Sequence, residues 1–279
     1  MACEVKIIKD SLNPRTGRRL TTMQLRYWRG IHGEFMTHRV FSRNASSSRA
    51  IPIMTFLKQV WNDPAGPTHW GANNPGMQAK TELTGFKLWF AKQTWKWTGR
   101  MVCGAVWAVN KISKPHKQTF NRLLEPWQYI SVIVTATDWD NFFELRNHPD
   151  AQPEICELAI AIHAAMIASR PQYRELHLPY VTDEEEQAYI DGKLTLETLF
   201  KISTARCARV SYLTHDGVKP SIDKDVRLHD QLVGSVPIHA SPTEHQAMAS
   251  TSVNEVYYKN FRGWRQYRVD VEERLTNNQ

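Results

Sequence analysis

The sequence predicts a mixed α and β fold within one domain. The chain has 279 residues, of which 42% are hydrophobic and 23% are charged, and this is the composition of a globular protein with a sizeable core. Glu4–Ile8 has the composition of a strand, and Pro153–Ser169 has the pattern of a helix. Because no repeat, low-complexity stretch or linker divides the chain, we expect residues 1–279 to form a single domain.

In the first half of the chain, turn residues separate the strand and helix signals. The strand at Glu4–Ile8 is followed by a basic turn at Asn13-Pro14. Residues 21–36 mix apolar and basic side chains and fit either a helix or a strand. The other expected elements are a helix over 51–63 that starts at Pro52, a turn-rich loop over 64–76, and a long aromatic helix over 77–111 that Gly99 or Gly104 can interrupt.

The second half of the chain is expected to be mostly helical. Residues 117–136 predict a helix with a break at Pro126, and Asp138 is a candidate N-cap for the next one. Further helices are expected over 153–169, from Thr182 with acidic residues in its first turn, over 194–210, and from Ser241, where Ser-Pro-Thr-Glu forms a capping box, before a frayed tail at 276–279.

Composition and charge exclude several classes of protein. No apolar run reaches the roughly 18 residues that a membrane span needs. The N-terminus lacks a signal-peptide core, so we expect a cytoplasmic protein. The four cysteines are scattered, without the spacing of a zinc site or of a disulfide framework. The net charge of +7 and the pI of 9.2 favour an anionic partner, and the scattered basic residues favour local phosphate pockets over a nucleic-acid stripe.

One stretch concentrates donors for an anion. Thr37–Arg49, THRVFSRNASSSR, holds three arginines and four serines in thirteen residues. Serine hydroxyls, backbone N–H groups and guanidinium groups together form a good cradle for a phosphate. A polar loop with ordinary turn serines is the alternative that the spacing leaves open.

The same stretch resembles the signature of the flavin-dependent thymidylate synthases (ThyX). The family pattern is Arg-His-Arg, seven residues and a Ser, with an Asn in the gap and an Arg two residues after the Ser. Five residues of this chain fall in register with it: His38, Arg39, Asn44, Ser47 and Arg49. The resemblance implies nucleotide contacts for Ser47, its neighbour Ser48, and Arg49. It implies flavin contacts for His38, Arg39 and Asn44.

A second segment, Thr137–Ile155, is similar to a family segment in which an Asn and, after four residues, an Arg have functional roles. Asn141 and Arg146 occupy these positions. The resemblance implies that Asn141 lies against the flavin and that Arg146, as the catalytic cation, faces the pyrimidine and favours its ionised N3. Arginine suits this role because it stays protonated and stabilises an anion as it forms. The alternative is a surface ion pair of Arg146 with Glu144 or Asp150.

A third match is short. Arg122 precedes Pro126 by the spacing of a family Arg that reaches the nucleotide phosphate across a subunit boundary. The resemblance therefore makes Arg122 a candidate for the nucleotide phosphate. The alternative is a solvated charge at a helix end.

A fourth match stands at an unexpected place in the chain. His239–His245 resembles the family's flavin motif, His-x-Thr/Ser-Pro-x-Glu-His, which implies flavin contacts for His239 and Ser241 and for Ser211 in the segment before it. In the family this motif precedes the Arg-His-Arg signature. The resemblance thus implies a circular permutation in which 195–250 correspond to the family's N-terminal segment. A metal-binding pair of histidines or a plain capped helix are the alternatives, and no third metal ligand is evident.

Three positions depart from the family pattern. Thr37 replaces the first Arg of the signature, Ala45 replaces a Glu, and Glu34 replaces a Gln. A carboxylate at position 34 would repel a phosphate, but it can accept a hydrogen bond from an amino group or an N3–H of a pyrimidine. This leaves open a different base, such as cytosine, or a different product at C5.

The resemblance implies an activity, a fold and an assembly. The activity is transfer of a one-carbon unit from methylenetetrahydrofolate to C5 of dUMP, with FAD as cofactor and NADPH as reductant. Two alternatives remain: flavin-dependent hydroxymethylation of dUMP or dCMP in a viral nucleotide-modification pathway, and a basic nucleic-acid-binding protein that has lost the flavin. The implied fold is α/β (α+β), with an antiparallel sheet flanked by helices, and the implied assembly is a homotetramer. We expect no metal and no membrane partner.

Overall fold

The computed structural model describes residues 3–75, 79, 81–210, 221–254 and 256–277. Its largest sheet has the strand order β3-β4-β2-β1-β5 and is antiparallel except for the short β1–β5 pair. The strands of this sheet are β1 (Cys3–Leu12), β2 (Arg19–Trp28), β3 (Ser42–Ala45), β4 (Tyr129–Ala136) and β5 (Gln172–Tyr173). A three-stranded sheet and a hairpin add β6 (Leu176–His177), β7 (Ala247–Ala249), β8 (Tyr257–Tyr258), β9 (Phe261–Arg262) and β10 (Trp264–Gln266).

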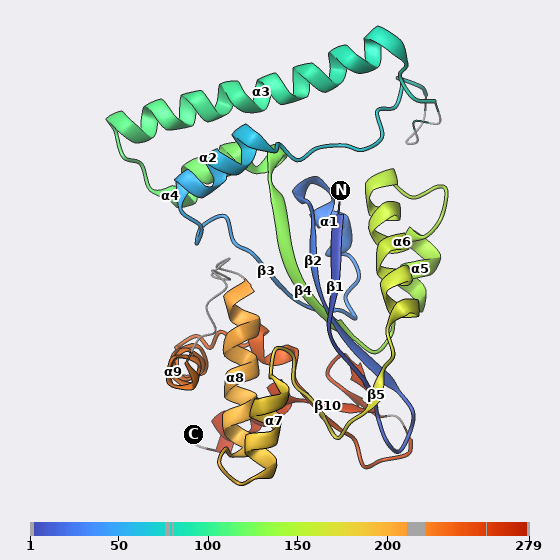
Figure 1. Cartoon of the computed structure of the whole chain (residues 1–279), viewed down its shortest axis with the longest axis vertical. Coiled ribbons are helices and arrows are strands. Elements are labelled where there is room, and N and C mark those ends of the chain that lie inside the picture. The colour runs from blue at the N-terminus through green and yellow to red at the C-terminus, as the bar shows by residue number, and fades with distance from the viewer. Residues whose placement is uncertain (1–2, 76–78, 80, 211–220, 255, 278–279) are drawn as a thin grey trace.

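Helices flank the large sheet, so the α/β fold predicted from the sequence is confirmed (Figure 1). The α-helices are α1 (His32–Phe35), α2 (Ile53–Asn62), α3 (Gly85–Ile112), α4 (Lys117–Phe120), α5 (Asp140–Arg146), α6 (Pro153–Ala168), α7 (Asp183–Ile190), α8 (Leu196–Arg209), α9 (Ile222–Val233) and α10 (Tyr267–Asn277). Short 3-10 helices are η1 (Arg29–Ile31), η2 (Asn121–Trp127) and η4 (Ser241–Glu244).

The two faces of β4 pack against different helices, because successive side chains of a strand point to opposite faces. Val132 and Val134 lie in a core with Leu158 and Ile162 of α6. The residue between the two valines, Ile133, packs instead with residues of the α8 end. The sheet therefore has α5 and α6 on one face and α8 on the other (Figure 1).

A helical arm lies at the far end of the molecule from α7, α8 and α10 (Figure 1). It consists of α2, α3 and η2, which share a second core. The glycines do not interrupt α3, which runs unbroken over 28 residues. Gly99 allows close packing, since a Cβ there would lie 3.0 Å from the ring of Trp127.

Several expected elements are confirmed. The N-terminal strand, the turn at Asn13, and the helices predicted over 51–63, 153–169 and 194–210 are present as β1, a turn, α2, α6 and α8. The helix from Thr182 has its capping box, with the Thr182 side chain accepting from Glu185 N–H. Residues 21–36, which fitted either structure, divide into the rest of β2 followed by η1 and α1.

Three expectations are wrong. Residues 129–136 form the strand β4 rather than a helix, because Val132, Ile133, Val134 and Thr135 are β-branched and pair with β2 and β3 on both sides. Asp138 does not cap α5; its carboxylate accepts from Thr137 Oγ1 at 2.8 Å and pairs with Arg262. The helix expected from Ser241 is one 3-10 turn without a side-chain cap, and the chain continues into β7.

The described residues show no helix long and apolar enough to cross a membrane. They also contain no group of three or more His, Cys, Asp or Glu side chains arranged to hold a metal ion. The four cysteines are all free thiols.

Candidate functional site

Thr37–Arg49 runs from the end of α1 through β3 to the turn before α2, and distant segments of the chain meet it at three points. The first is the C-terminal end of α5. Arg146 Nε donates to His38 Nε2 at 3.1 Å, Nη2 donates to Thr37 Oγ1 at 3.3 Å, and Nη1 pairs with Glu34 Oε2 at 3.4 Å. The structure therefore brings Glu34, His38 and Arg146 together.

His38 is a neutral acceptor in this cluster. Its side chain is buried and packs edge-on against Phe142 of α5, with ring centroids 4.9 Å apart. Burial lowers its pKa, and the cations Arg146 and Arg43 lower it further. Because Nε2 accepts from Arg146, the ring proton of neutral His38 lies on Nδ1. The histidine thus fixes the direction of the guanidinium without competing with it for an anion.

The second meeting point is β3. Asn44 Nδ2 donates to the backbone oxygen of Cys207 in α8 at 3.0 Å. Gln266 Nε2 bridges Ser42 Oγ and the backbone oxygen of Glu244, at 3.0 Å each. The segment that resembles the flavin motif therefore packs beside the strand that carries the first signature, although about 200 residues separate them in the chain.

A buried chain of hydrogen bonds joins His245, the last residue of that segment, to the sheet. His245 Nδ1 contacts Thr135 Oγ1 at 2.9 Å, and Thr135 Oγ1 contacts Thr22 Oγ1 at 2.7 Å. His177 then bridges Thr22 at 2.7 Å and Ser11 at 2.9 Å. All five side chains are fully buried, so burial lowers the pKa of His245 to about 3 and that of His177 well below its usual value.

The third meeting point joins the turn that contains Ser46–Ser48 to η2. Asn121 Nδ2 donates to the backbone oxygen of Ser48 at 2.6 Å, and Ser48 Oγ donates to Glu125 at 2.8 Å. Ser47 Oγ accepts from the Arg49 N–H at 3.3 Å. Arg49 and Arg122, which follows Asn121 in η2, are both exposed, and neither forms an ion pair with another described residue. The structure thus places two free cations on adjoining segments.

Other candidate residues are described but are not brought into these contacts. Arg39, Asn141, His239 and Ser241 are exposed, and their side chains make no hydrogen bond to another described residue. Ser211 lies outside the described residues. Nor do the candidates line the apolar groove of about 620 Å³ between α2 and α3, whose walls include Leu57, Trp61, Cys103 and Trp107.

No pattern in the sequence indicates the contact between two residues beside α1, Tyr27 and His32. Tyr27 OH lies 2.8 Å from His32 Nδ1, and burial together with Arg29 and Arg43 lowers the pKa of His32 to about 4. Burial raises the pKa of Tyr27, so the phenol donates and the imidazole accepts. Arg43 Nη1 donates to the backbone oxygens of Phe35 and Met36 at 3.2 and 2.9 Å. These residues shape the end of α1 that carries Glu34.

Comparison with known proteins gives a distant structural likeness. No family model and no curated protein matches the sequence. The chain is similar in structure to PolB from Streptomyces cacaoi, a UMP/dUMP methylase, in crystals with 5-Br UMP and with 5-Br dUMP. The TM-scores are 0.47 and 0.45, with 14% identity, over 59% of this chain and 88% or 89% of PolB. At these values the likeness alone identifies neither a reaction nor a substrate.

Proposed function

We propose that the chain is a flavin-dependent enzyme that transfers a one-carbon unit from methylenetetrahydrofolate to C5 of a deoxypyrimidine nucleotide. The observation that carries this proposal is the contact between Arg146 and His38, at 3.1 Å. The two residues come from sequence motifs about 100 positions apart, each of which resembles a part of the ThyX site. A thymidylate synthase reaction on dUMP is the form that the resemblance implies.

Arg146 presents a positioned guanidinium to a pyrimidine, and Glu34 pairs with it. Arg146 is held by a neutral histidine and a threonine hydroxyl, so its cation is positioned before substrate binds. Burial raises the pKa of Cys207 and raises that of Cys103 to about 11, so neither thiol is a ready nucleophile. Catalysis by orientation and electrostatics, rather than by a covalent thiolate at these cysteines, fits both observations.

The nucleotide phosphate would bind at the turn between β3 and α2. Arg49 and Arg122 are exposed there, and the Ser48 backbone holds the two segments together through Asn121. Cationic side chains and serine hydroxyls are the usual partners of phosphate. We assign Ser47 with them to this role.

The donor set also fits FAD. Arg39, Asn141, His239 and Ser241 are exposed and unused by other described residues, and a guanidinium, an amide, an imidazole and a hydroxyl match the acceptors of a flavin dinucleotide. These four residues would hold the cofactor with Asn44. When bound, FAD supplies the reducing equivalents for the transferred carbon, with NADPH as their source.

Two measurements test the function. Purified protein, as isolated or after incubation with FAD, should show the visible absorption of a bound flavin. Reduced protein with methylenetetrahydrofolate and a deoxypyrimidine nucleotide should give a product heavier by one carbon unit in mass spectrometry, and Arg146→Gln should abolish it while retaining the flavin. A protein that binds neither FAD nor a pyrimidine nucleotide would overturn the proposal.

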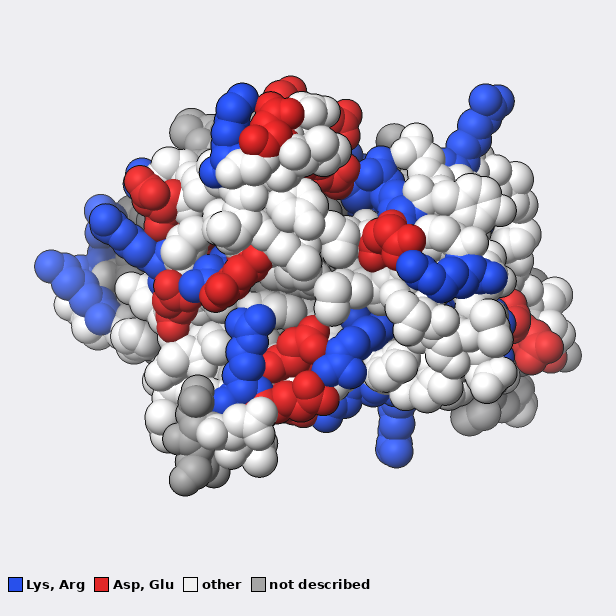
Figure 2. Space-filling model, turned by 90° about the horizontal axis from the view of Figure 1, so that it is seen from below, with Lys and Arg blue, Asp and Glu red and all other residues white. Residues whose placement is uncertain are grey.

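The nucleic-acid-binding alternative is the less favoured one. On the face seen from below, Lys and Arg lie intermingled with Asp and Glu, without a continuous basic stripe (Figure 2). Several cations of the described chain pair with neighbouring carboxylates, as in Arg268–Glu272 and Arg265–Asp270. A face with mixed charges gives little of the electrostatic attraction that a phosphate backbone requires.

We propose that copies of this chain associate through the exposed face of α3. Phe86, Phe90, Trp97 and Met101 are between 56% and 73% exposed and recur every three or four residues or a multiple of that spacing. A patch of this kind on a soluble protein marks an interaction site. Helical spacing of apolar residues suits another helix, and the apolar groove beside α2 can receive side chains from it. A second copy of this chain is the occupant we propose.

A further inference from the structure

The side chains of Glu34 and Arg146 have unused hydrogen-bonding capacity in a definite pattern. A guanidinium has five N–H donors. Arg146 directs three of these N–H groups to His38, Thr37 and Glu34. Two N–H groups remain, one on each terminal nitrogen. Glu34 uses Oε2 for Arg146, while Oε1 accepts from no described residue. Both side chains are partly exposed, at 20% for Arg146 and 35% for Glu34, and are therefore accessible to a ligand.

This pattern of donors and acceptors complements cytosine better than uracil. The outer edge of cytosine presents the N4 amino donor and then the acceptors N3 and O2. A carboxylate accepts from the N4 amino group, and two guanidinium N–H groups can donate to the two acceptors. Uracil presents the acceptor O4, the donor N3–H and the acceptor O2. If Glu34 faced O4, two acceptors would oppose each other. If Glu34 faced N3–H, Arg146 could reach the carbonyl on one side only, and the other carbonyl would be left without a partner from this pair.

The net charge of the cluster also favours cytosine over uracil. The cation of Arg146 and the anion of Glu34 sum to zero, and His38 and Thr37 add no charge when His38 is neutral. An ionised N3 of uracil would need a net positive neighbourhood. Cytosine has no N3–H to ionise, so a neutral pair that reads donors and acceptors suits it.

We infer that the Glu34–Arg146 pair selects cytosine, so that a deoxycytidine monophosphate rather than dUMP is the substrate. The inference rests on the proposed function, because it takes Arg146 to face the pyrimidine. Glu34 is then the residue that determines the base, and Arg146 serves both bases.

Binding measurements separate this inference from the proposed function. Isothermal titration of the whole chain with dCMP, dUMP and, as a purine reference, dAMP requires neither folate nor turnover. We expect wild type to bind dCMP about 10- to 100-fold more tightly than dUMP, the discrimination of a well-placed hydrogen-bonding pair. In Glu34→Gln the amide can donate to O4, so the preference should fall by at least about tenfold or reverse.

The matched control is Glu175→Gln, which removes the same charge from the exposed Arg15–Glu175 pair and should leave the preference unchanged. Thermal melts confirm that each variant is folded. Tighter binding of dUMP than of dCMP by wild type would overturn the inference and leave the proposed function standing. So would an unchanged dCMP preference in Glu34→Gln. Binding of no pyrimidine nucleotide, or of dAMP equally well, would overturn both.

Discussion

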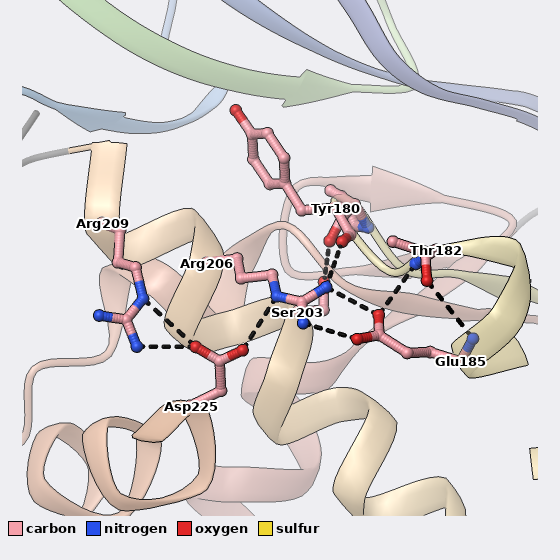
Figure 3. Close-up of polar contacts among 8 residues, drawn as sticks. Tyr180, Thr182, Glu185, Ser203, Arg206, Arg209 and Asp225 are labelled. Atoms are coloured by element: carbon pink, nitrogen blue, oxygen red, sulfur yellow. Dashed lines mark hydrogen bonds and ion pairs between the residues drawn. The ribbon is translucent and has the colours of Figure 1, made fainter. Parts of the chain in front are cut away.

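A buried ion network fixes the helices beneath β3 (Figure 3). Arg206 in α8 donates to Glu185 through two bonds of 2.7 Å, to Asp225 at 2.9 Å and to the backbone oxygen of Tyr180 at 2.7 Å. Arg209 also pairs with Asp225, at 2.7 Å. The side chains of Arg206 and Glu185 are 7% exposed and that of Asp225 is fully buried. Three helices, α7, α8 and α9, are thus joined through one guanidinium.

The substitution Arg206→Met should lower the free energy of unfolding by about 3–5 kcal/mol, the cost of breaking a buried pair by removing one partner. Asp225 keeps Arg209, but Glu185 loses its cation while staying buried. The loss therefore comes mainly from Glu185. Arg206→Met with Glu185→Gln removes that uncompensated charge and should be at least about 1 kcal/mol more stable than the single variant.

Urea unfolding followed by far-UV circular dichroism measures these differences. Arg15→Met is the matched control, because Arg15 pairs with Glu175 at 2.8 Å but both side chains are exposed, at 36% and 58%. Its cost should stay below about 1 kcal/mol. The reasoning fails if Arg206→Met and Arg15→Met differ by less than about 1 kcal/mol, or if the double variant is no more stable than Arg206→Met.

Three further predictions concern pH, phosphate and assembly. Burial lowers the pKa of His245 from 6.5 to about 3, so between these values the unfolded chain binds a proton that the folded chain does not. Stability should therefore fall as the pH falls through that window, and His245→Gln should reduce the slope by up to ~1.4 kcal/mol per pH unit in urea titrations. Arg49→Gln and Arg122→Gln should each weaken binding of a nucleotide about tenfold and leave the nucleoside unaffected in calorimetry; an equal loss for both ligands contradicts the phosphate assignment. Trp97→Asp should reduce the mass found by light scattering to that of the monomer, and a monomeric wild type would exclude the α3 interface.

The sequence predicted those elements whose local pattern agrees with their surroundings. Pro153–Ala168 has proline in its first turn and a continuous apolar run, and it is helical as expected. The pattern of residues 117–136 predicts one broken helix, and only the part up to and including Trp127 is helical. The β-branched run of β4 was the local signal for a strand. The pairing of β4 with β2 on one side and β3 on the other is a tertiary fact that no local pattern contains.

The sequence predicts which residues belong to the candidate site, but it does not predict which of them contact each other. The motifs indicate His38 and Arg146 separately, and Glu34 stands out because it departs from the pattern that the motifs resemble. That the carboxylate pairs with Arg146, across 112 positions, depends on where α1 and α5 end in space. The roles of Arg43 and His32 were missed because their partners are backbone oxygens and a buried phenol, which leave no spacing signal.

The buried chain through Thr22 and Thr135 bears on the permutation, which stays a prediction. The η4 segment is held to the sheet by side chains: His245 bonds to Thr135, and Gln266 bridges Ser42 and the backbone of Glu244. None of these contacts depends on which segment comes first in the chain. A flavin motif anchored in this way would keep its place beside β3 after its coding segment had moved, provided that the new connections span the surface. The side-chain anchors, rather than the order of the elements, would then be what preserves the site.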